Sequence, residues 1–199
     1  MNYWLRLAPF AVLWLAWLAY WIVAARDVKR TRRRQSFITR LAAVVPTVLA
    51  AALLAFPDQP LSWLNAHFLP RTMAAYWIGL LMVAAGLTFA VWARRHLGRD
   101  WSGIVTVKED HELIRSGPYR FVRHPIYSGL LLAILGTAVA FGERRGLLAF
   151  ALLTVSLLFK LRMEERFMSE TFGERYVRYR AEVPALIPFI GRNRPRADD

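Results

Sequence analysis

Five uncharged and strongly apolar stretches constrain the fold of this chain more than any other feature of its sequence. They run over Leu7–Ala25, Leu41–Pro57, Thr72–Ala93, Pro125–Gly142 and Gly146–Phe159. A helix needs about 20 residues, with about 17 tolerated, to cross a hydrocarbon core of about 30 Å. The first four stretches have that length. The fifth reaches it if it includes Lys160–Met163, with its two cations at the membrane interface or facing the protein interior.

Helices are the only spanning structures that suit these stretches, because no alternating strand pattern of a barrel is present. We therefore expect an all-α, polytopic membrane protein with five transmembrane helices. A length of 199 residues without internal repeats favours a single integral membrane domain over residues 1–199.

Basic residues are concentrated in particular loops. The chain has 27 Lys and Arg against 14 Asp and Glu. Segments 26–40, 94–123 and the tail from Arg162 hold seven, seven and eight basic residues, whereas 58–71 and 143–145 hold one and two. The positive-inside rule then predicts an N-terminus outside and a C-terminus in the cytoplasm. This distribution indicates loops beside anionic headgroups and argues against a nucleic-acid partner.

Several chemistries are excluded by missing residues. The chain has no cysteine, which rules out disulfides, a catalytic thiol, and zinc–thiolate or iron–sulfur sites. No dinucleotide-binding, P-loop, zinc-protease or nucleophile-elbow motif occurs. The four histidines show no paired ligand spacing, so no metal site is expected.

The first polar segment of interest leads into the fourth apolar stretch. It reads His111-Glu-Leu-Ile-Arg-Ser-Gly-Pro-Tyr119 and continues to Arg123-His124-Pro125-Ile126-Tyr127. Pro125 suits the first helical turn, which places His124 at the helix cap beside free backbone N–H groups. Such a helix start can hold an anionic group, or it can serve only as a headgroup anchor.

The second polar segment follows the fifth apolar stretch. Lys160 and Glu164 are four residues apart, and Arg162 and Glu165 are three apart, so each pair shares a helix face. Charges at this depth are costly unless they are paired or functional, and both readings remain open. Farther on, Met168, Phe172, Tyr176 and Tyr179 form an apolar stripe. The stripe predicts a C-terminal amphipathic interfacial helix.

Together, the motifs resemble those of the isoprenylcysteine carboxyl methyltransferase family, which belongs with the membrane-embedded phospholipid methyltransferases. The matching residues are His111–Tyr119, Arg123-His124-Pro125-x-Tyr127-x-Gly129, Glu164-Glu165, Phe172-Gly173-x-x-Tyr176-x-x-Tyr179 and Val183-Pro184 with Ile187-Pro188. A methyltransferase core over residues 94–190 is therefore expected. The two helices and the basic loop within residues 1–57 match the family only in kind.

The resemblance implies S-adenosyl-L-methionine as methyl donor, bound on the cytosolic side, with S-adenosyl-L-homocysteine as product. It assigns donor binding to His111, Glu112, Leu113, Ile114, Tyr119, His124, Pro125, Ile126, Tyr127 and Glu164.

The acceptor side departs from the family pattern. Better-known members carry an arginine four positions before the glutamate that matches Glu164, where this chain has Lys160. A lysine cannot make the planar, two-pronged contact of an arginine with a carboxylate, and Arg162 could take over that role. An amine acceptor would need a base, for which Glu165 or His124 could serve. The catalytic candidates are Lys160, Arg162 and Glu165.

The activity implied by the resemblance is carboxyl O-methylation of a protein isoprenylcysteine at the cytoplasmic membrane interface. The short five-helix form favours a prokaryotic cell membrane, where a phospholipid amine, a small thiol or an isoprenoid acid could instead be the lipidic or amphipathic acceptor. Two rival hypotheses remain: an NADPH-dependent membrane reductase of the sterol-reductase type, and a non-enzymatic membrane scaffold. The sequence leaves the oligomeric state open.

Overall fold

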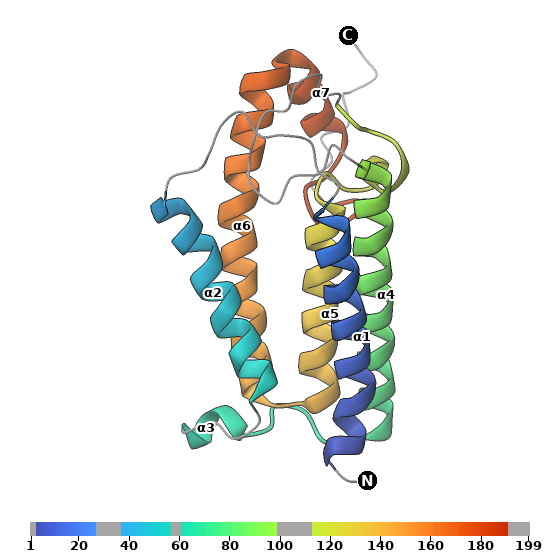
Figure 1. The fold of residues 1–199 in the computed structure, drawn as a ribbon, viewed down its shortest axis with the longest axis vertical. Helices are drawn as coiled ribbons and strands as arrows, with labels where there is room; N and C mark the ends of the chain where they lie inside the picture. Colours follow the sequence, from blue (N-terminus) through green and yellow to red (C-terminus); the bar gives the residue numbers. More distant parts are fainter. Residues whose placement is uncertain (1–2, 27–36, 57–60, 99–112, 191–199) are drawn as a thin grey trace.

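The computed structural model describes residues 3–26, 37–56, 61–98 and 113–190, which form a bundle of helices (Figure 1). In chain order the helices are α1 (Tyr3–Ala24), α2 (Phe37–Ala55), α3 (Ser62–Asn65), α4 (Met73–Leu97), the 3₁₀ turn η2 (Gly117–Arg120), α5 (Pro125–Phe141), α6 (Arg144–Phe172) and α7 (Glu174–Glu182). The all-α prediction is therefore confirmed for the described residues.

Three of these helices are long and apolar enough to cross a membrane. Their apolar spans lie over Leu5–Ala24, Met73–Leu97 and Arg144–Phe172. The helix α5, and the apolar part of α2 over Val44–Ala55, are shorter apolar helices. Three of the five predicted spans therefore have the length and composition that crossing a membrane requires. The other two stay predictions, as does the inside–outside orientation.

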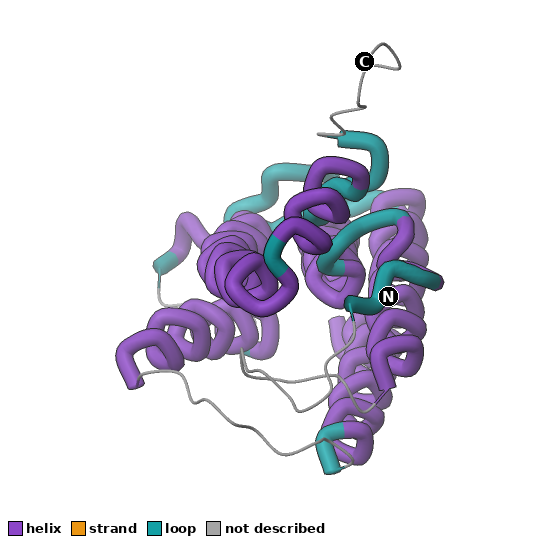
Figure 2. Tube along the Cα trace, turned by 90° about the horizontal axis from the view of Figure 1, so that it is seen from above, coloured by secondary structure: helices purple, strands orange, loops and turns teal. Residues whose placement is uncertain are grey.

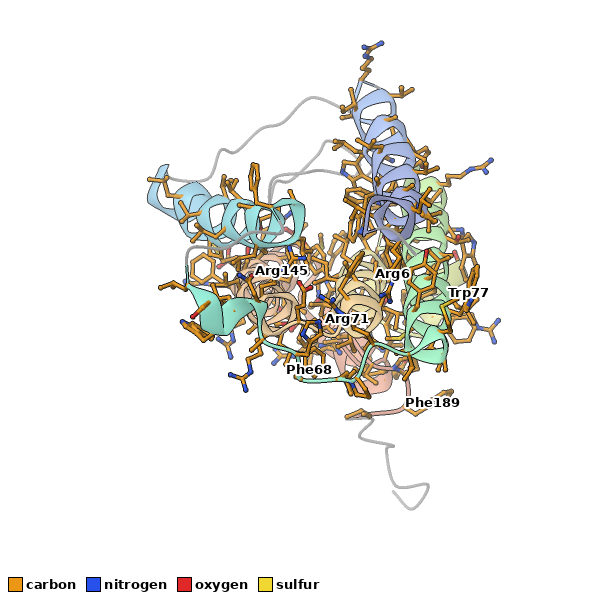
Figure 3. The ribbon with its side chains drawn as sticks, turned by 90° about the horizontal axis from the view of Figure 1, so that it is seen from below. Arg6, Phe68, Arg71, Trp77, Arg145 and Phe189 are labelled. Atoms are coloured by element: carbon orange, nitrogen blue, oxygen red, sulfur yellow. The ribbon has the colours of Figure 1, made fainter. Side chains whose placement is uncertain are left out.

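Helices α4, α5 and α6 stand side by side, with α1 packed against α4 and α2 against α6 (Figures 1 and 3). Glycines allow α4 and α5 to approach closely. A Cβ atom added to Gly79 or Gly86 would lie 2.4 Å from the carbonyl oxygen of Gly136 or Gly129, respectively. Small residues are the usual means of close packing between helices in lipid, where no hydrophobic effect draws them together.

Two buried arginines bind the carbonyl groups at helix ends, which lack partners within the helix itself. In the last turn of α4, whose C-terminal end is the upper one in Figure 1, Arg94 donates to the carbonyls of Ala24 and Gly98, each at 2.6 Å. At the lower end, Arg145 donates to the carbonyls of Leu53 at 2.9 Å and Phe56 at 3.0 Å (Figure 3). The first arginine joins α1 to α4, and the second joins α2 to α6.

The predicted apolar stripe is divided between two helices. The helix α6 continues to Phe172, and Gly173, with φ +54°, starts a new direction for α7. Tyr176 and Tyr179 are buried against the protein's own residues, including Leu113 and Met168. The stripe is therefore covered by the protein itself, and an interfacial position of α7 stays a prediction.

Candidate functional site

The start of α5 is held in place by a segment from near the end of the described chain. The backbone N–H groups of Arg123 and His124 donate to the carbonyls of Pro184 at 2.9 Å and Ala185 at 3.0 Å. Ser128 adds a hydroxyl hydrogen bond of 2.6 Å to the carbonyl of Leu186. These bonds form a strap, residues 184–186, across the end of α5 where Pro125 begins the helix.

Glu164 lies at the centre of a cluster that joins α5 to α6. It accepts a hydrogen bond of 2.5 Å from the hydroxyl of Tyr127. Nδ1 of His124 lies 3.5 Å from one carboxylate oxygen, and Nζ of Lys160 lies 3.9 Å from the other. The rings of His124 and Tyr127 stack with centroids 5.4 Å apart, and the lysine ammonium lies 5.5 Å from the Tyr127 ring centroid.

Glu165, the next residue, points into a different set of contacts. Its Oε1 accepts from Nε and Nη2 of Arg123 at 2.8 and 2.5 Å, and it lies 3.3 Å from Nε2 of His124. Nε of Arg180 lies 3.7 Å from the other oxygen. Arg123 also donates to the carbonyls of Arg180 and Val183. Glu165 therefore ties α6 to the start of α5 and to α7.

His124 lies between the two carboxylates. Burial lowers the pKa of its imidazole, but hydrogen bonds and charge from Glu164 and Glu165 outweigh that effect and leave the pKa raised above its ordinary value. The environment thus favours the protonated ring, in which both nitrogens donate.

Tyr119 connects the η2 turn to α4 and α7. Its hydroxyl donates to the carbonyl of Ala93 at 3.5 Å, while its own carbonyl accepts a 2.6 Å hydrogen bond from the hydroxyl of Tyr179. Burial raises the pKa of the Tyr119 hydroxyl, so it stays protonated. The turn itself needs Gly117, whose φ is +57°, and a Cβ there would lie 2.7 Å from the ring of His96.

Comparison with known proteins adds a family to this geometry. A sequence model of the family described as phospholipid methyltransferase matches residues 74–175, which include nearly all of α4 and the whole of α5 and α6. The chain belongs to the phospholipid methyltransferase family.

Similar members of this family are isoprenylcysteine methyltransferases. The chain is 31% identical over 129 residues to protein-S-isoprenylcysteine O-methyltransferase B of Arabidopsis thaliana, covering 62% of this chain and 66% of the relative. It is 32% identical over 145 residues to a probable rice enzyme, Oryza sativa subsp. indica, covering 69% and 76%. The human protein-S-isoprenylcysteine O-methyltransferase is 35% identical over 140 residues, covering 65% and 49%.

A solved member has the same arrangement of helices. The structure of a eukaryotic intramembrane Ras methyltransferase, isoprenylcysteine carboxyl methyltransferase, matches with a TM-score of 0.52 and 25% identity. The match covers 80% of this chain and 55% of the solved enzyme. The chain thus spans 55% of that enzyme and between 49% and 76% of the relatives above. Like the solved enzyme, it is an integral membrane protein.

Several of the residues that the family resemblance assigns to donor binding lie together in the structure. His124, Tyr127 and Glu164 are in mutual contact, and Pro125 and Ile126 form the first turn of α5 beside them. Leu113 packs with the tyrosines of α7, and Ile114 packs against the main core that contains Tyr119 and Tyr127. His111 and Glu112 lie outside the described residues.

The three catalytic candidates separate in space. Lys160 shares the face of Glu164, and the predicted contact between these two is confirmed. Arg162 is exposed, and two helical residues turn the chain by about 200°, so it faces away from Glu164. The predicted Arg162–Glu165 pair is wrong, because Glu165 pairs with Arg123 and Arg180 instead.

Two residues that position this candidate site were missed at the level of sequence. Arg123 stood within the motif but received no role, although its side chain is buried against Glu165. His96 stacks on Tyr119 with centroids 6.3 Å apart and shares a 2.8 Å hydrogen bond with the hydroxyl of Ser116. His96 lies in the last turn of α4, and helical periodicity does not indicate which residues outside the helix, such as Ser116, a side chain will meet.

Proposed function

We propose that this protein transfers a methyl group from S-adenosyl-L-methionine to a lipidic or amphipathic acceptor at the cytoplasmic face of the membrane. The reaction is most like carboxyl O-methylation of an isoprenylcysteine. The observation that carries the proposal is the convergence of Tyr127, His124 and Lys160 on the single carboxylate of Glu164. The names of the similar family members support the same reaction.

The residues present suit the proposed donor, which carries a carboxylate and an ammonium beside its sulfonium. The first turn of α5 has backbone N–H groups without intrahelical partners, which suit a carboxylate. The carboxylate of Glu164 suits the ammonium, and the Tyr127 hydroxyl fixes its orientation. The bound donor would supply a methyl group on positively charged sulfur, open to displacement by a nucleophile.

The surroundings of Glu165 favour a carboxylate acceptor over an amine. An acceptor amine must lose a proton, whereas a carboxylate with a pKa of about 4 is already ionised at neutral pH. Glu165 is held by Arg123, Arg180 and His124, so it has little capacity left to act as a base. Lys160, with a quarter of its side chain exposed, can orient an acceptor carboxylate for in-line attack.

Access for a lipidic acceptor is supported by the apolar outer faces of the helices near the site. Phe159 on α6 and Val48 on α2 are 40% and 58% exposed. A prenyl chain could therefore approach from the bilayer while the donor enters from the cytosol. The proposal includes a prokaryotic cell membrane as the location of the protein and a site that faces the cytoplasm.

The test is a methyl-transfer assay with the full chain in detergent and S-adenosylmethionine labelled on its methyl group. N-acetyl-S-farnesylcysteine, phosphatidylethanolamine, a small thiol and farnesoic acid are supplied in parallel. We expect label in the farnesylcysteine as an alkali-labile ester. Label only in the amine or thiol would overturn the carboxylate assignment.

The same preparation is titrated with S-adenosylhomocysteine and with NADPH. We expect micromolar binding of the first compound and none of the second. Binding of NADPH alone would favour the reductase hypothesis. Binding of neither compound by folded protein would favour the scaffold hypothesis.

A further inference from the structure

A basic pocket lies between the segment that leads into η2 and the helix α7. Its volume is about 280 Å³, and it is lined by Leu113, Arg115, Arg175, Arg178 and Glu182. The helix α7 lies at the upper end of the bundle (Figures 1 and 2). The charge distribution of the chain predicts that this end faces the cytoplasm.

One arginine of the pocket is fixed by the protein. Arg115 forms an ion pair with Glu182, and its guanidinium carbon lies 5.1 Å from the ring centroid of Tyr179. Tyr179 is itself buried. The pair of Arg115 and Glu182 is neutral overall, and it gives the pocket a preorganised wall of hydrogen-bond donors.

The other two arginines leave the pocket with an excess of two positive charges. Arg175 and Arg178 are exposed and three residues apart, so their side chains lie on one face of α7. Within the described part of the chain, neither forms an ion pair or hydrogen bond. Like charges at this spacing repel each other, and an anion bound between them would relieve that repulsion.

The chemistry of the pocket points to a phosphate group. Guanidinium groups bind phosphate oxygens through paired hydrogen bonds, and arginine is favoured over lysine for that contact. Anionic phospholipids present phosphate at the cytoplasmic surface and attract basic residues that lie beside it. The volume exceeds that of a phosphate alone, and the side chain of Leu113 adds an apolar wall. Both features suit a phosphate that is joined to a larger headgroup.

We propose that this pocket binds the phosphate-bearing headgroup of an anionic phospholipid. Leu113 is also one of the donor candidates of the family resemblance. Within the described structure, however, none of the four charged lining residues forms a hydrogen bond or ion pair with Glu164 or Tyr127, so the basic part of the pocket is distinct from the cluster around Glu164. It would hold α7, and with it the segment before η2, at a fixed depth beside the membrane surface.

The experiment titrates the full chain in detergent with dihexanoyl phosphatidylglycerol, dihexanoyl phosphatidylcholine and inorganic phosphate, in the absence of donor. The pocket variant is R175Q/R178Q. The matched control is R120Q/R166Q, which removes the same charge from exposed positions outside the pocket. Elution volume and thermal unfolding verify the fold of each variant, and the single variant R178Q is the milder alternative.

We expect the wild type to bind phosphatidylglycerol at least tenfold more tightly than phosphatidylcholine. The pocket variant should lose at least tenfold in that affinity, R178Q about threefold, and the control less than twofold. Inorganic phosphate should bind at least tenfold more weakly than the anionic lipid.

Three results would overturn the proposal. An equal loss in the pocket and control variants would mean that only net charge matters. Phosphate binding as tight as lipid binding would assign the pocket to a soluble anion instead of a membrane component. Competition between phosphatidylglycerol and S-adenosylhomocysteine would place the anion in the donor site. Donor titration of the pocket variant, which should match the wild type, keeps this test distinct from that of the proposed methyl transfer.

Discussion

The bundle has a buried polar cluster at each end, and the two clusters differ in how fully their charges are used by the protein. At the lower end, Glu143 accepts from Arg145 at 2.5 Å and from Arg71 at 3.1 Å (Figure 3), while Arg145 also binds carbonyls of α2. At the upper end, Glu164 has a tyrosine, a histidine and a lysine 3.9 Å away. In the lower cluster the arginines and Glu143 are hydrogen-bonded to one another. In the upper cluster the ammonium of Lys160 lies beyond hydrogen-bond distance of Glu164.

The same contrast separates two neighbouring residues. Glu165 resembles Glu143, because arginines lie at both of its oxygens and one of them, Arg123, also donates to backbone carbonyls. Glu164 is the one whose partners can turn toward a bound molecule. A buried charge near a membrane is therefore a poor guide to catalysis by itself, and the remaining hydrogen-bonding capacity of its partners is a better one.

The largest expected effect comes from the lower cluster. Arg145→Ala removes one of the two arginines that donate to buried Glu143, together with the hydrogen bonds to the α2 carbonyls of Leu53 and Leu54. Breaking a buried ion pair costs about 3–5 kcal/mol, so the midpoint of thermal unfolding should fall by several degrees. Donor affinity of the fraction that remains folded should stay within twofold. A selective loss of donor binding with unchanged unfolding would refute the division between the clusters.

Glu164→Gln should weaken donor binding strongly and lower thermal stability only a little, the reverse of Arg145→Ala. The variant keeps the shape of the side chain but loses the charge that faces Tyr127 and the proposed donor ammonium. Loss of one charge-assisted hydrogen bond, about 1.5–3 kcal/mol, predicts at least tenfold weaker binding of S-adenosylhomocysteine in calorimetric titration. Glu165→Gln is the neighbour for comparison, and it should lower the thermal midpoint more than Glu164→Gln does. The reverse order in either measurement would count against the assignment.

Lys160→Ala sharpens the distinction between donor and acceptor. Because Lys160 is proposed to orient the acceptor carboxylate, we expect the KM for the acceptor to rise about fivefold, roughly 1 kcal/mol, with donor affinity unchanged. Arg162→Ala, on the opposite side of α6, is the matched control and should change neither quantity by more than twofold. A larger effect at Arg162 would restore it as the acceptor-binding cation.

The smallest expected effect is a dependence of stability on pH. The pKa of His124 is raised in the folded protein, so the protonated ring contributes stability that is fully present below its unfolded pKa of about 6.5. That contribution should disappear as the pH rises through the higher folded value. Thermal midpoints of the wild type measured upward from pH 6 should show this decline, and His124→Gln should show less of it. A wild-type midpoint that rises over this range would contradict the direction of the shift.

Local features of the fold and site could be predicted from sequence. Uncharged stretches located the five long helices, and a spacing of four residues predicted the contact of Lys160 with Glu164. The charged residues after Phe159 suggested the end of a span, yet α6 continues to Phe172, because a helix can extend beyond the apolar layer. The helix α6 ends at Gly173, whose φ of +54° is not helical.

The contacts that were missed join residues far apart in the chain. Arg123 meets Glu165 across 42 positions, and Arg145 meets the carbonyl of Leu53 across 92. Periodicity reports which residues share a helix face, but not which helix that face meets. The two glutamates at 164 and 165 look equivalent in sequence, and only the packing of α5 and α7 assigns them different partners.

The strap across the start of α5 has a consequence for the biosynthesis of the protein. The amides of Arg123 and His124 bond to carbonyls at positions 184 and 185, which the ribosome adds some 60 residues later. All the long helices can therefore enter the membrane before the site has its final partners. A nascent chain would acquire a competent site only after synthesis had passed Leu186, so translation that stops early would leave an inserted but inert product.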